Sequence, residues 1–360
     1  GFVTKRGATF LFEDGSTGTS ISFARGLGDC RNTTYQVSRA RFDQLLLDAA
    51  VERDAELREG WRVSEVELGE RGVTIEIAPT AEHGRGDRER LEARFLVDAS
   101  GQAGFLSKRL KLRRPDPALA NVAVYAHFEG VRSLDRVPRG DIQVISRRDL
   151  GWLWVIPLSE SLTSVGAVVP TSRLRQRGGR SKEHVLEEIV ATTPVVATQL
   201  EGADRATEVR CEADFSYGCR AYAEDPWLLA GDAGSFLDPV FSTGVQLALE
   251  SGEAAAETLD RALREPNSAQ VCHERYHERQ LERFRHFQRY VRSFYDPAFR
   301  DLLCEPTERL GMVRAMTSIL AGDSGRRWRV RWRLAVFFLL VQLQRRWVLA
   351  TRRHLRTSAR

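Results

Sequence analysis

The sequence predicts an α/β fold in which one sheet-containing domain interrupts another and the chain ends in helices. Residues 227–230 are a short apolar run of the kind that forms a buried parallel strand, and a helix is expected directly afterwards, over 244–264. Residues 122–169 have instead the pattern of successive antiparallel strands. Beyond residue 244 the pattern is helical almost throughout.

The other elements are predicted from local patterns in chain order. Residues 38–52 form an amphipathic helix whose apolar side chains share one face. These side chains are Phe42, Leu45, Leu46 and Ala49. Strands are expected at 9–13, 20–24, 61–77, 91–97, 122–129, 142–146, 151–157 and 163–169, and another helix at 181–199.

Composition excludes several classes of protein. The 360 residues are 42% hydrophobic and 29% charged, as in an ordinary enzyme, and no apolar run is long enough to cross a bilayer. The five cysteines are scattered without metal-binding spacing, which favours reduced core thiols in a cytoplasmic protein. His273 and His277 lie on a charge-rich helix and are expected to be solvated, so no metal site is predicted.

The last 35 residues have an unusual charge pattern. Residues 326–360 contain eleven arginines and no acidic residue, around the apolar stretch 334–341. A terminal helix that buries one face and solvates the other accounts for this pattern. A surface for an acidic partner or for anionic lipid is the alternative. No nucleic-acid-binding motif accompanies the charge, so that partner is not predicted.

Residues 227–244 have the chemistry of a ligand site. Gly231 lets a ligand approach the backbone, and Asp232 follows the strand at the end where α/β sheets present binding groups. The helix that begins at Gly244 directs free N–H groups and a positive dipole end toward the same place, which suits an anion. A plain strand-to-helix turn with a Ser or Thr cap is the alternative.

Lysine usage is also informative. Only Lys5, Lys108, Lys111 and Lys182 are lysines among 54 basic residues. A desolvated lysine can release its proton and act as a nucleophile, whereas arginine stays protonated. Lysines retained in such a chain are therefore candidates for chemistry, although Lys182 has the pattern of ordinary surface.

Several short motifs resemble those of the flavin-dependent halogenases, in the tryptophan-halogenase-like superfamily. This superfamily lies within the class of FAD enzymes built like p-hydroxybenzoate hydroxylase. The matching segments are 151–157 (GWLWVIP), 236–244 (FLDPVFSTG), 1–5 (GFVTK), 37–43 (VSRARFD), 97–101 (VDASG) and 231–233 (GDA). No G-x-G-x-x-G occurs, and the chain begins at Gly1. The resemblance therefore implies a two-domain FAD-binding fold that lacks its first βαβ unit.

The resemblance implies a division of the chain and a set of cofactor contacts. Residues 36–118 and 205–264 would form the FAD domain, 1–35 and 119–204 the substrate domain with a mixed and antiparallel sheet, and 265–360 a helical region. The expected cofactor-binding residues are Arg39, Asp98, Gly101, Gly231, Asp232, Ala233, Pro239 and Gly244. Arg39 paired with an acid and Asp98 capping a turn are the alternative interpretations of two of them.

The resemblance also implies a mechanism in two compartments. Thr243 and Gly244 would bind chloride or bromide through their N–H groups beside the flavin, with Ser242 among the catalytic residues. Reduced flavin and O2 would then convert the halide into hypohalous acid. Trp152 and Trp154 would wall the flavin from the substrate. Lys5 would hold the acid or become a chloramine next to the substrate carbon. Core aromatics and a surface lysine are the alternative interpretations of these three residues.

One position bears on the substrate. Indole-directed members of the family carry Glu directly before Ser-Thr-Gly, and here that position is Phe241. A phenolic or pyrrolic substrate needs less help from a carboxylate, so such a substrate is expected, free or tethered to an acidic carrier protein that the arginine-rich end would meet. A separate flavin reductase is the other expected partner.

Three other functions remain open at this point. An FAD-dependent monooxygenase would share the fold but hydroxylate its substrate. A geranylgeranyl-reductase-like flavin enzyme has a related tryptophan segment and would not need Lys5. A non-catalytic peripheral membrane protein would bind anionic vesicles through residues 326–360.

Overall fold

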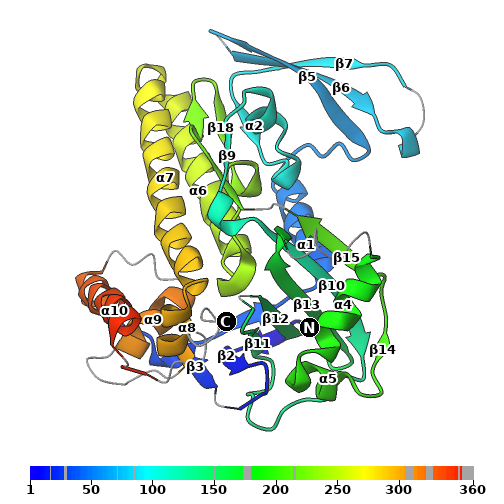
Figure 1. Ribbon diagram of the computed structural model, residues 1–360. Helices are drawn as coiled ribbons and strands as arrows, with labels where there is room; N and C mark the ends of the chain where they lie inside the picture. The colour runs from blue at the N-terminus through cyan, green and yellow to red at the C-terminus, as the bar shows by residue number, and fades with distance from the viewer. Residues whose placement is uncertain are drawn as a thin grey trace.

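The computed structural model of the chain describes most of its length (Figure 1). The described residues are 1–16, 18–27, 31–70, 72–83, 86–149, 151–172, 180–213, 216–304, 312–321, 327–347 and 349–350. Cys30 and residues 351–360 of the arginine-rich end lie outside them.

A large mixed sheet is the centre of the fold. Its strands run in the order β14-β10-β13-β12-β11-β2-β3, and β15 also pairs with β10. Every neighbouring pair is antiparallel except β2 and β11. The strands are β2 (Gly7–Phe12), β3 (Thr19–Ser22), β10 (Asn121–Glu129), β11 (Ile142–Ser146), β12 (Trp152–Pro157), β13 (Leu162–Pro170), β14 (Asp204–Arg205) and β15 (Arg210–Ala213). The predicted antiparallel run over 122–169 is confirmed.

Alternation along these strands supplies two cores, one on each face of the sheet. Leu153 and Val155 of β12 face a cluster completed by α4 (Lys182–Ala191) and α5 (Pro194–Leu200). The expected single helix at 181–199 is therefore wrong. Pro194 stands in the first turn of α5, where its missing N–H is not needed, and the chain breaks before it.

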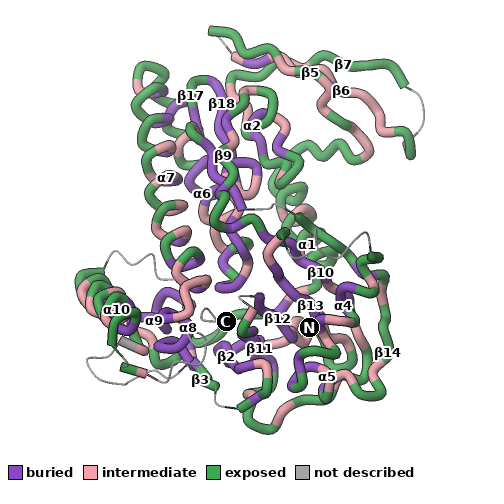
Figure 2. The backbone as a smooth tube through the Cα atoms, in the orientation of Figure 1, coloured by how far each residue is buried: buried purple, intermediate pink, exposed green. Residues whose placement is uncertain are grey.

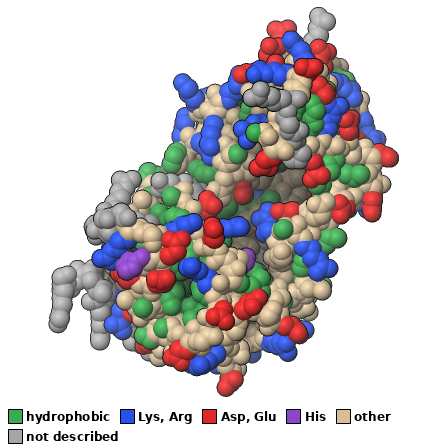
Figure 3. Space-filling view, turned by 90° about the vertical axis from the view of Figure 1, so that its right-hand side faces the viewer, with side chains coloured by type: hydrophobic (Ala, Val, Ile, Leu, Met, Phe, Trp, Pro, Cys, Tyr) green, Lys and Arg blue, Asp and Glu red, His purple; other side chains and the backbone are tan. Residues whose placement is uncertain are grey.

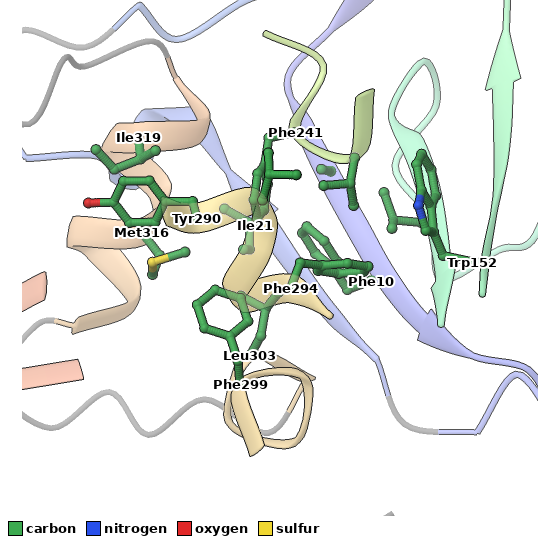
Figure 4. Close-up of a cluster of buried hydrophobic side chains, with 14 of the residues drawn as sticks. Phe10, Ile21, Trp152, Phe241, Tyr290, Phe294, Phe299, Leu303, Met316 and Ile319 are labelled. Carbon is green, nitrogen blue, oxygen red and sulfur yellow. The ribbon is translucent and has the colours of Figure 1, made fainter. Parts of the chain in front are cut away.

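The opposite face carries the larger core. Trp152 and Trp154 of β12 pack there with Phe10 of β2 and with side chains from four helices. These helices are α7 (Ala269–Phe294), α8 (Pro297–Cys304), α9 (Met312–Leu320) and α10 (Trp328–Arg346). Figure 4 shows Phe294 lying between the sheet side chains and the aromatic residues of this helical group. The C-terminal helices thus share one core with the sheet.

A parallel strand pair next to α6 (Gly244–Arg264) completes the predicted α/β part. β18 (Trp227–Leu229) runs parallel to β8 (Leu96–Asp98) and antiparallel to β17 (Ala223–Glu224). The parallel strand and the helix expected after it are both confirmed. Figure 1 shows α6 and α7 side by side along this part. The remaining short elements are β1 (Val3–Lys5), β4 (Thr34–Gln36), β9 (Arg113–Pro115), β16 (Tyr217–Cys219) and α2 (Phe105–Arg109).

One helix and one small sheet are largely exposed. α1 (Arg39–Val51) forms where the sequence predicts a helix, yet it contains no buried residue, and Leu45 and Leu46 are 51% and 43% exposed. An antiparallel sheet of β5 (Trp61–Gly69), β6 (Gly72–Pro79) and β7 (Glu89–Ala93) stands beyond it. Figure 2 shows both segments mainly in the colours of exposed and half-buried residues.

The structure bears on two further predictions, the division into domains and the exposure of His273. The division into an FAD domain, a substrate domain and a helical region stays a prediction, but β14 and β15 pair with β10 of the large sheet although 205–213 were assigned to the FAD domain. His273 was expected to be solvated, and this is wrong. It is buried, and a ring nitrogen lies 2.7 Å from the carbonyl oxygen of Ala269 one helical turn earlier.

Candidate active site

The ends of the two parallel strands bring distant segments together. The Ala230 N–H, directly after β18, donates to the Asp98 carbonyl at the end of β8, over 2.9 Å. The turn η5 (Gly231–Ala233) follows, and Gly231 has a φ of +56°, which a side chain would disfavour. Two of the predicted cofactor-binding segments, 98–101 and 231–233, therefore lie side by side.

Asp98 uses both of its carboxylate oxygens on the neighbouring backbone. One oxygen accepts the Ser100 N–H over 2.9 Å and the other accepts the Leu106 N–H over 2.7 Å. Asp98 is buried, so its side chain shapes the turn that carries Gly101. A side chain at Gly101 would point into open space, which leaves room for a ligand in front of this turn.

Asp232 and Arg39 form the charged part of the site. Burial raises the pKa of the half-buried Asp232 carboxyl, and the positive charge of Arg39 opposes that rise. Arg39 begins α1 and also pairs with Asp43 across one helical turn, over 2.9 Å, while its side chain stays 64% exposed. Both the flavin-facing and the acid-pairing interpretations of Arg39 thus have a structural basis.

The loop before α6 presents backbone groups to open space. Asp238 caps the short helix η6 (Pro239–Phe241) by accepting the Val240 N–H. Ser242 then takes a φ of +55°, and Thr243 precedes α6 without donating or accepting a side-chain cap bond. A side chain at Gly244 would meet nothing within 4 Å. Thr243 and Gly244 line a cavity with Gly231 and Asp232, so the uncapped start of α6, with its positive dipole end, lies beside space for a ligand.

The two predicted tryptophans form a packed pair. The indoles of Trp152 and Trp154 lie 5.7 Å apart between ring centroids and are nearly or fully buried. The Trp154 Nε1–H donates to the Ser164 hydroxyl over 3.1 Å. Gly166, opposite Trp154 on β13, makes room for this ring, because an added Cβ would lie 2.3 Å from the indole Cζ2.

Hydrogen bonds tie the tryptophan pair to the loop before α6. The Trp152 Nε1–H donates to the Tyr295 hydroxyl over 3.0 Å, and that hydroxyl donates to the Asp238 carboxylate over 2.5 Å. The Asn121 amide donates to the same carboxylate oxygen over 3.1 Å. Burial raises the pKa of Asp238 and contributes most to the raised pKa of Tyr295. A connected buried network of this kind fixes side-chain positions.

The guanidinium of Arg300 stabilises the same region through hydrogen bonds to backbone carbonyl oxygens. It is fully buried, and it donates to the carbonyl oxygens of Phe294 over 2.6 Å and of Gly151 over 3.1 Å. Burial lowers its pKa to about 10. The sequence offered no signal for Arg300 or Tyr295. Only Asp238 lay inside a recognised motif, since it precedes Pro239 in the segment 236–244.

Lys5 lies in a different part of the structure. It ends β1, which pairs with β4 opposite Thr34, and it is 7% exposed. Its Nζ lies 5.7 Å from the ring centroid of Phe23. Burial lowers the Lys5 pKa to about 8, and Asp141 partly opposes this effect. The alternative interpretation of Lys5 as a surface residue is therefore wrong.

The predicted residues fall into three groups, of which the first two meet, because Gly231 and Asp232 line one cavity together with Thr243 and Gly244. Asp98, Gly101, Arg39 and residues 231–233 lie around the ends of the parallel strands. The tryptophan pair joins Pro239, Ser242, Thr243 and Gly244 through the Tyr295–Asp238 network. Within the described part of the chain, no hydrogen bond, ion pair or ring contact links Lys5 to either group.

Three other features receive no support from the described residues or from the face that Figure 3 shows. No group of three or more His, Cys, Asp or Glu side chains is placed to hold a metal ion there. No described helix is long and apolar enough to span a bilayer. Figure 3 shows basic and acidic side chains interspersed over one face of the molecule, not the continuous basic stripe of a nucleic-acid-binding surface.

Comparisons with known proteins show which proteins this chain is similar to. A family model described as tryptophan halogenase matches residues 21–301. A 1H-pyrrole-2-carbonyl-[peptidyl-carrier protein] chlorinase of Pseudomonas fluorescens is 29% identical over 307 residues, which cover 82% of this chain and 66% of the relative. A sulochrin halogenase of Aspergillus terreus is 30% identical over 302 residues, 77% of this chain and 54% of that protein.

Solved structures give the same result. The myxobacterial chondrochloren halogenase CndH, an FAD-dependent halogenase, aligns with a TM-score of 0.74 and 33% identity over 82% of this chain and 68% of that one. The flavin-dependent halogenase CmlS aligns with a TM-score of 0.76 and 28% identity over 93% of this chain and 58% of that one. The chain spans between 43% and 66% of the length of the first curated relatives it matches.

Proposed function

The chain belongs to the tryptophan halogenase family, and from that membership we propose that the whole protein is a flavin-dependent halogenase. The observation that carries the proposal is the loop 238–244, which offers an anion an open helix start and is hydrogen-bonded through Tyr295 to the tryptophan pair. With halide at this loop and the tryptophans as a barrier, the network would hold the two in fixed relation, which supports a two-compartment mechanism.

The residues around the parallel strands fit FAD. The half-buried Asp232 carboxylate can accept bonds from the hydroxyls of a ribityl chain, and Arg39 next to it supplies a positive charge. The open spaces in front of Gly101 and Gly244 leave room for the cofactor on this side. When bound, reduced and exposed to O2, the flavin supplies the oxidation of chloride or bromide to hypohalous acid.

This chain's own residues supply the remaining parts of the mechanism. The backbone N–H groups of Thr243 and Gly244 would bind the halide without a full positive charge beside it. Trp152 and Trp154 would exclude the substrate from the flavin side, because both rings are buried and closely packed. Lys5 would then hydrogen-bond the hypohalous acid or form a chloramine, and a pKa of about 8 gives it access to both protonation states near neutral pH.

The substrate class follows from the position before Ser242. Phe241 is 5% exposed and packs edge-on against Phe294, with ring centroids 6.0 Å apart. An apolar ring thus stands where indole-directed members carry a carboxylate, which favours a phenolic or pyrrolic substrate that activates its own ring. A relative that acts on a pyrrole held by a peptidyl-carrier protein supports this class and also a carrier-tethered substrate.

The cellular setting is part of the same proposal. A separate flavin reductase would supply the reduced cofactor. Cys219, Cys272 and Cys304 are buried, whereas Cys211 is exposed, so the expectation of core thiols is wrong for Cys211. We place the protein in the reducing cytoplasm, where thiols persist.

The test measures halogen transfer directly. FAD binding is first measured by flavin fluorescence, and the protein is then supplied with FAD, a flavin reductase, NADH, O2 and bromide, with a phenol and a pyrrole thioester as acceptors. We expect brominated product by mass spectrometry, and the Lys5→Arg variant should still oxidise flavin but lose bromination. Hydroxylated product would identify a monooxygenase. Unimpaired bromination in Lys5→Arg would remove Lys5 from the mechanism.

A further inference from the structure

A buried aspartate holds the backbone that follows Lys5. Asp141 is 4% exposed and stands just before β11. One of its carboxylate oxygens accepts two N–H groups, from Arg6 over 2.8 Å and from Gly7 over 2.7 Å. These are the two residues directly after the lysine, so Asp141 fixes where β1 ends and β2 begins.

The backbone packs closely around the Asp141 contact, at Gly7 and at Gly140. An added Cβ at Gly7 would lie 2.9 Å from the second Asp141 oxygen and 2.1 Å from the Ile21 carbonyl oxygen. Gly140 has a φ of +89°, and an added Cβ there would lie 2.2 Å from the Thr4 carbonyl oxygen. Two glycines thus allow the 140–141 turn to press against the lysine-bearing strand.

We propose that Asp141 is a positioning residue for Lys5, which fixes the backbone directly after the lysine and supplies a negative charge near the buried amine. The inference deepens the proposed halogenase function, since it explains how a lysine is held, still able to carry a proton, in an apolar setting. No comparison or motif assigned a role to Asp141.

The electrostatics of the pair support this role. Burial lowers the Lys5 pKa to about 8, and Asp141 is the charged group that opposes this effect. Burial also raises the Asp141 pKa, while the two backbone N–H groups, Lys5 and Arg6 act to lower it. The Phe23 ring and the amide of Gln36, which donates to the Gly140 carbonyl oxygen, are the neutral groups on this side. Without Asp141 the amine would lose its proton more easily.

The alternative is that Asp141 is only a backbone clamp. Asp141→Asn separates the two functions, because the amide oxygen can still accept both N–H groups while the negative charge is gone. Asp135→Asn, in the same inter-strand segment but at an exposed position, removes the same charge without touching β1 and serves as the control.

The readout is the proton affinity of Lys5 itself. The chain has four lysines, so biosynthetic labelling with [13C,15N]lysine gives four side-chain signals, and Lys5→Arg identifies the one from Lys5. We expect Lys5 to titrate near pH 8 in the parent protein. In Asp141→Asn its proton affinity should fall by roughly three- to tenfold, with no change in Asp135→Asn.

Two outcomes would overturn the inference. An unchanged Lys5 midpoint in Asp141→Asn, with the Lys5 backbone amide signal in place, would leave Asp141 as a clamp only. A parent midpoint near the ordinary lysine value would remove the electrostatic basis. The titration needs neither flavin nor substrate, so failure of the halogenation assay would not be confused with either result. In an active enzyme, the limb of the pH profile governed by Lys5 should move to lower pH in Asp141→Asn.

Discussion

At the scale of single residues, the Lys5 ammonium is buried, and burial disfavours its charged form. Its folded pKa of about 8 lies below the ordinary 10.5, so the folded protein binds this proton more weakly than the unfolded chain does. The cost of burial is therefore fully present below pH 8. It diminishes as the pH rises toward 10.5. Such a cost is typical of a group retained for chemistry.

Replacing that lysine by an apolar residue should stabilise the protein. We expect Lys5→Met to raise the free energy of unfolding at pH 7 by up to about 3 kcal/mol, since a unit of pKa is worth about 1.4 kcal/mol. The gain should shrink between pH 8 and pH 10. Urea denaturation at both ends of this range measures it, with the exposed Lys182→Met as control. A gain that does not vary with pH would show that packing, not charge, is responsible.

At the scale of elements, the sequence predicted the site segments better than their connections. Residues 151–157 and 236–244 were recognisable because strand, turn and helix signals are local. Their link through Tyr295 was not, because it joins β12, the turn after α7 and the loop before α6 across 57 and 143 residues of sequence. Periodicity carries no information on such tertiary hydrogen bonds.

Removing one hydroxyl should loosen that link. Tyr295→Phe deletes the donor to Asp238 and the acceptor of Trp152 while keeping the ring, and leaves two buried polar groups short of a partner. We expect a loss of roughly 1–3 kcal/mol in the free energy of unfolding. Denaturant titration measures this loss, and Tyr35→Phe, at a ring that is 60% exposed, should be neutral. Equal stabilities of the two variants would refute a structural role for the network.

For α1 the sequence predicted the position of the helix but not its exposure. Its position was predicted correctly and its apolar side chains were expected to share one face, yet no residue of this helix is buried. Amphipathic spacing identifies the apolar face of a helix. It does not tell whether other residues of the described part of the chain cover that face.

At the scale of the whole molecule, the arginine-rich end combines core side chains with exposed positive charge. Leu334, Phe337 and Val341 of α10 belong to the core that holds the tryptophan pair, as expected for a helix that buries one face. Arg329 and Arg331 are exposed on the two flanks of this buried face, and α10 contains no acidic residue. Deleting this end would therefore remove core side chains together with charge, so single side chains are the better probes of a docking role.

Charge reversal on the exposed face should weaken contact with an acidic partner. We expect the double variant Arg329→Glu, Arg331→Glu to bind an acidic carrier protein about tenfold more weakly at low salt, with a smaller difference at high salt. Arg275→Glu with Arg285→Glu, two exposed positions on α7, is the matched control. Unchanged carrier binding would exclude this face of α10, and binding to anionic vesicles instead would favour a lipid surface.

The absence of a side chain at Gly166 has a consequence beyond local packing. The Trp154 indole rests against this strand position, and a methyl group there would also lie 2.5 Å from the Tyr125 Cβ. Any larger residue would force the ring away from β13. Position 166 thus limits how close the indole lies to β13, so a substitution there would change the thickness of the proposed barrier without altering a charge or a hydrogen-bonding group.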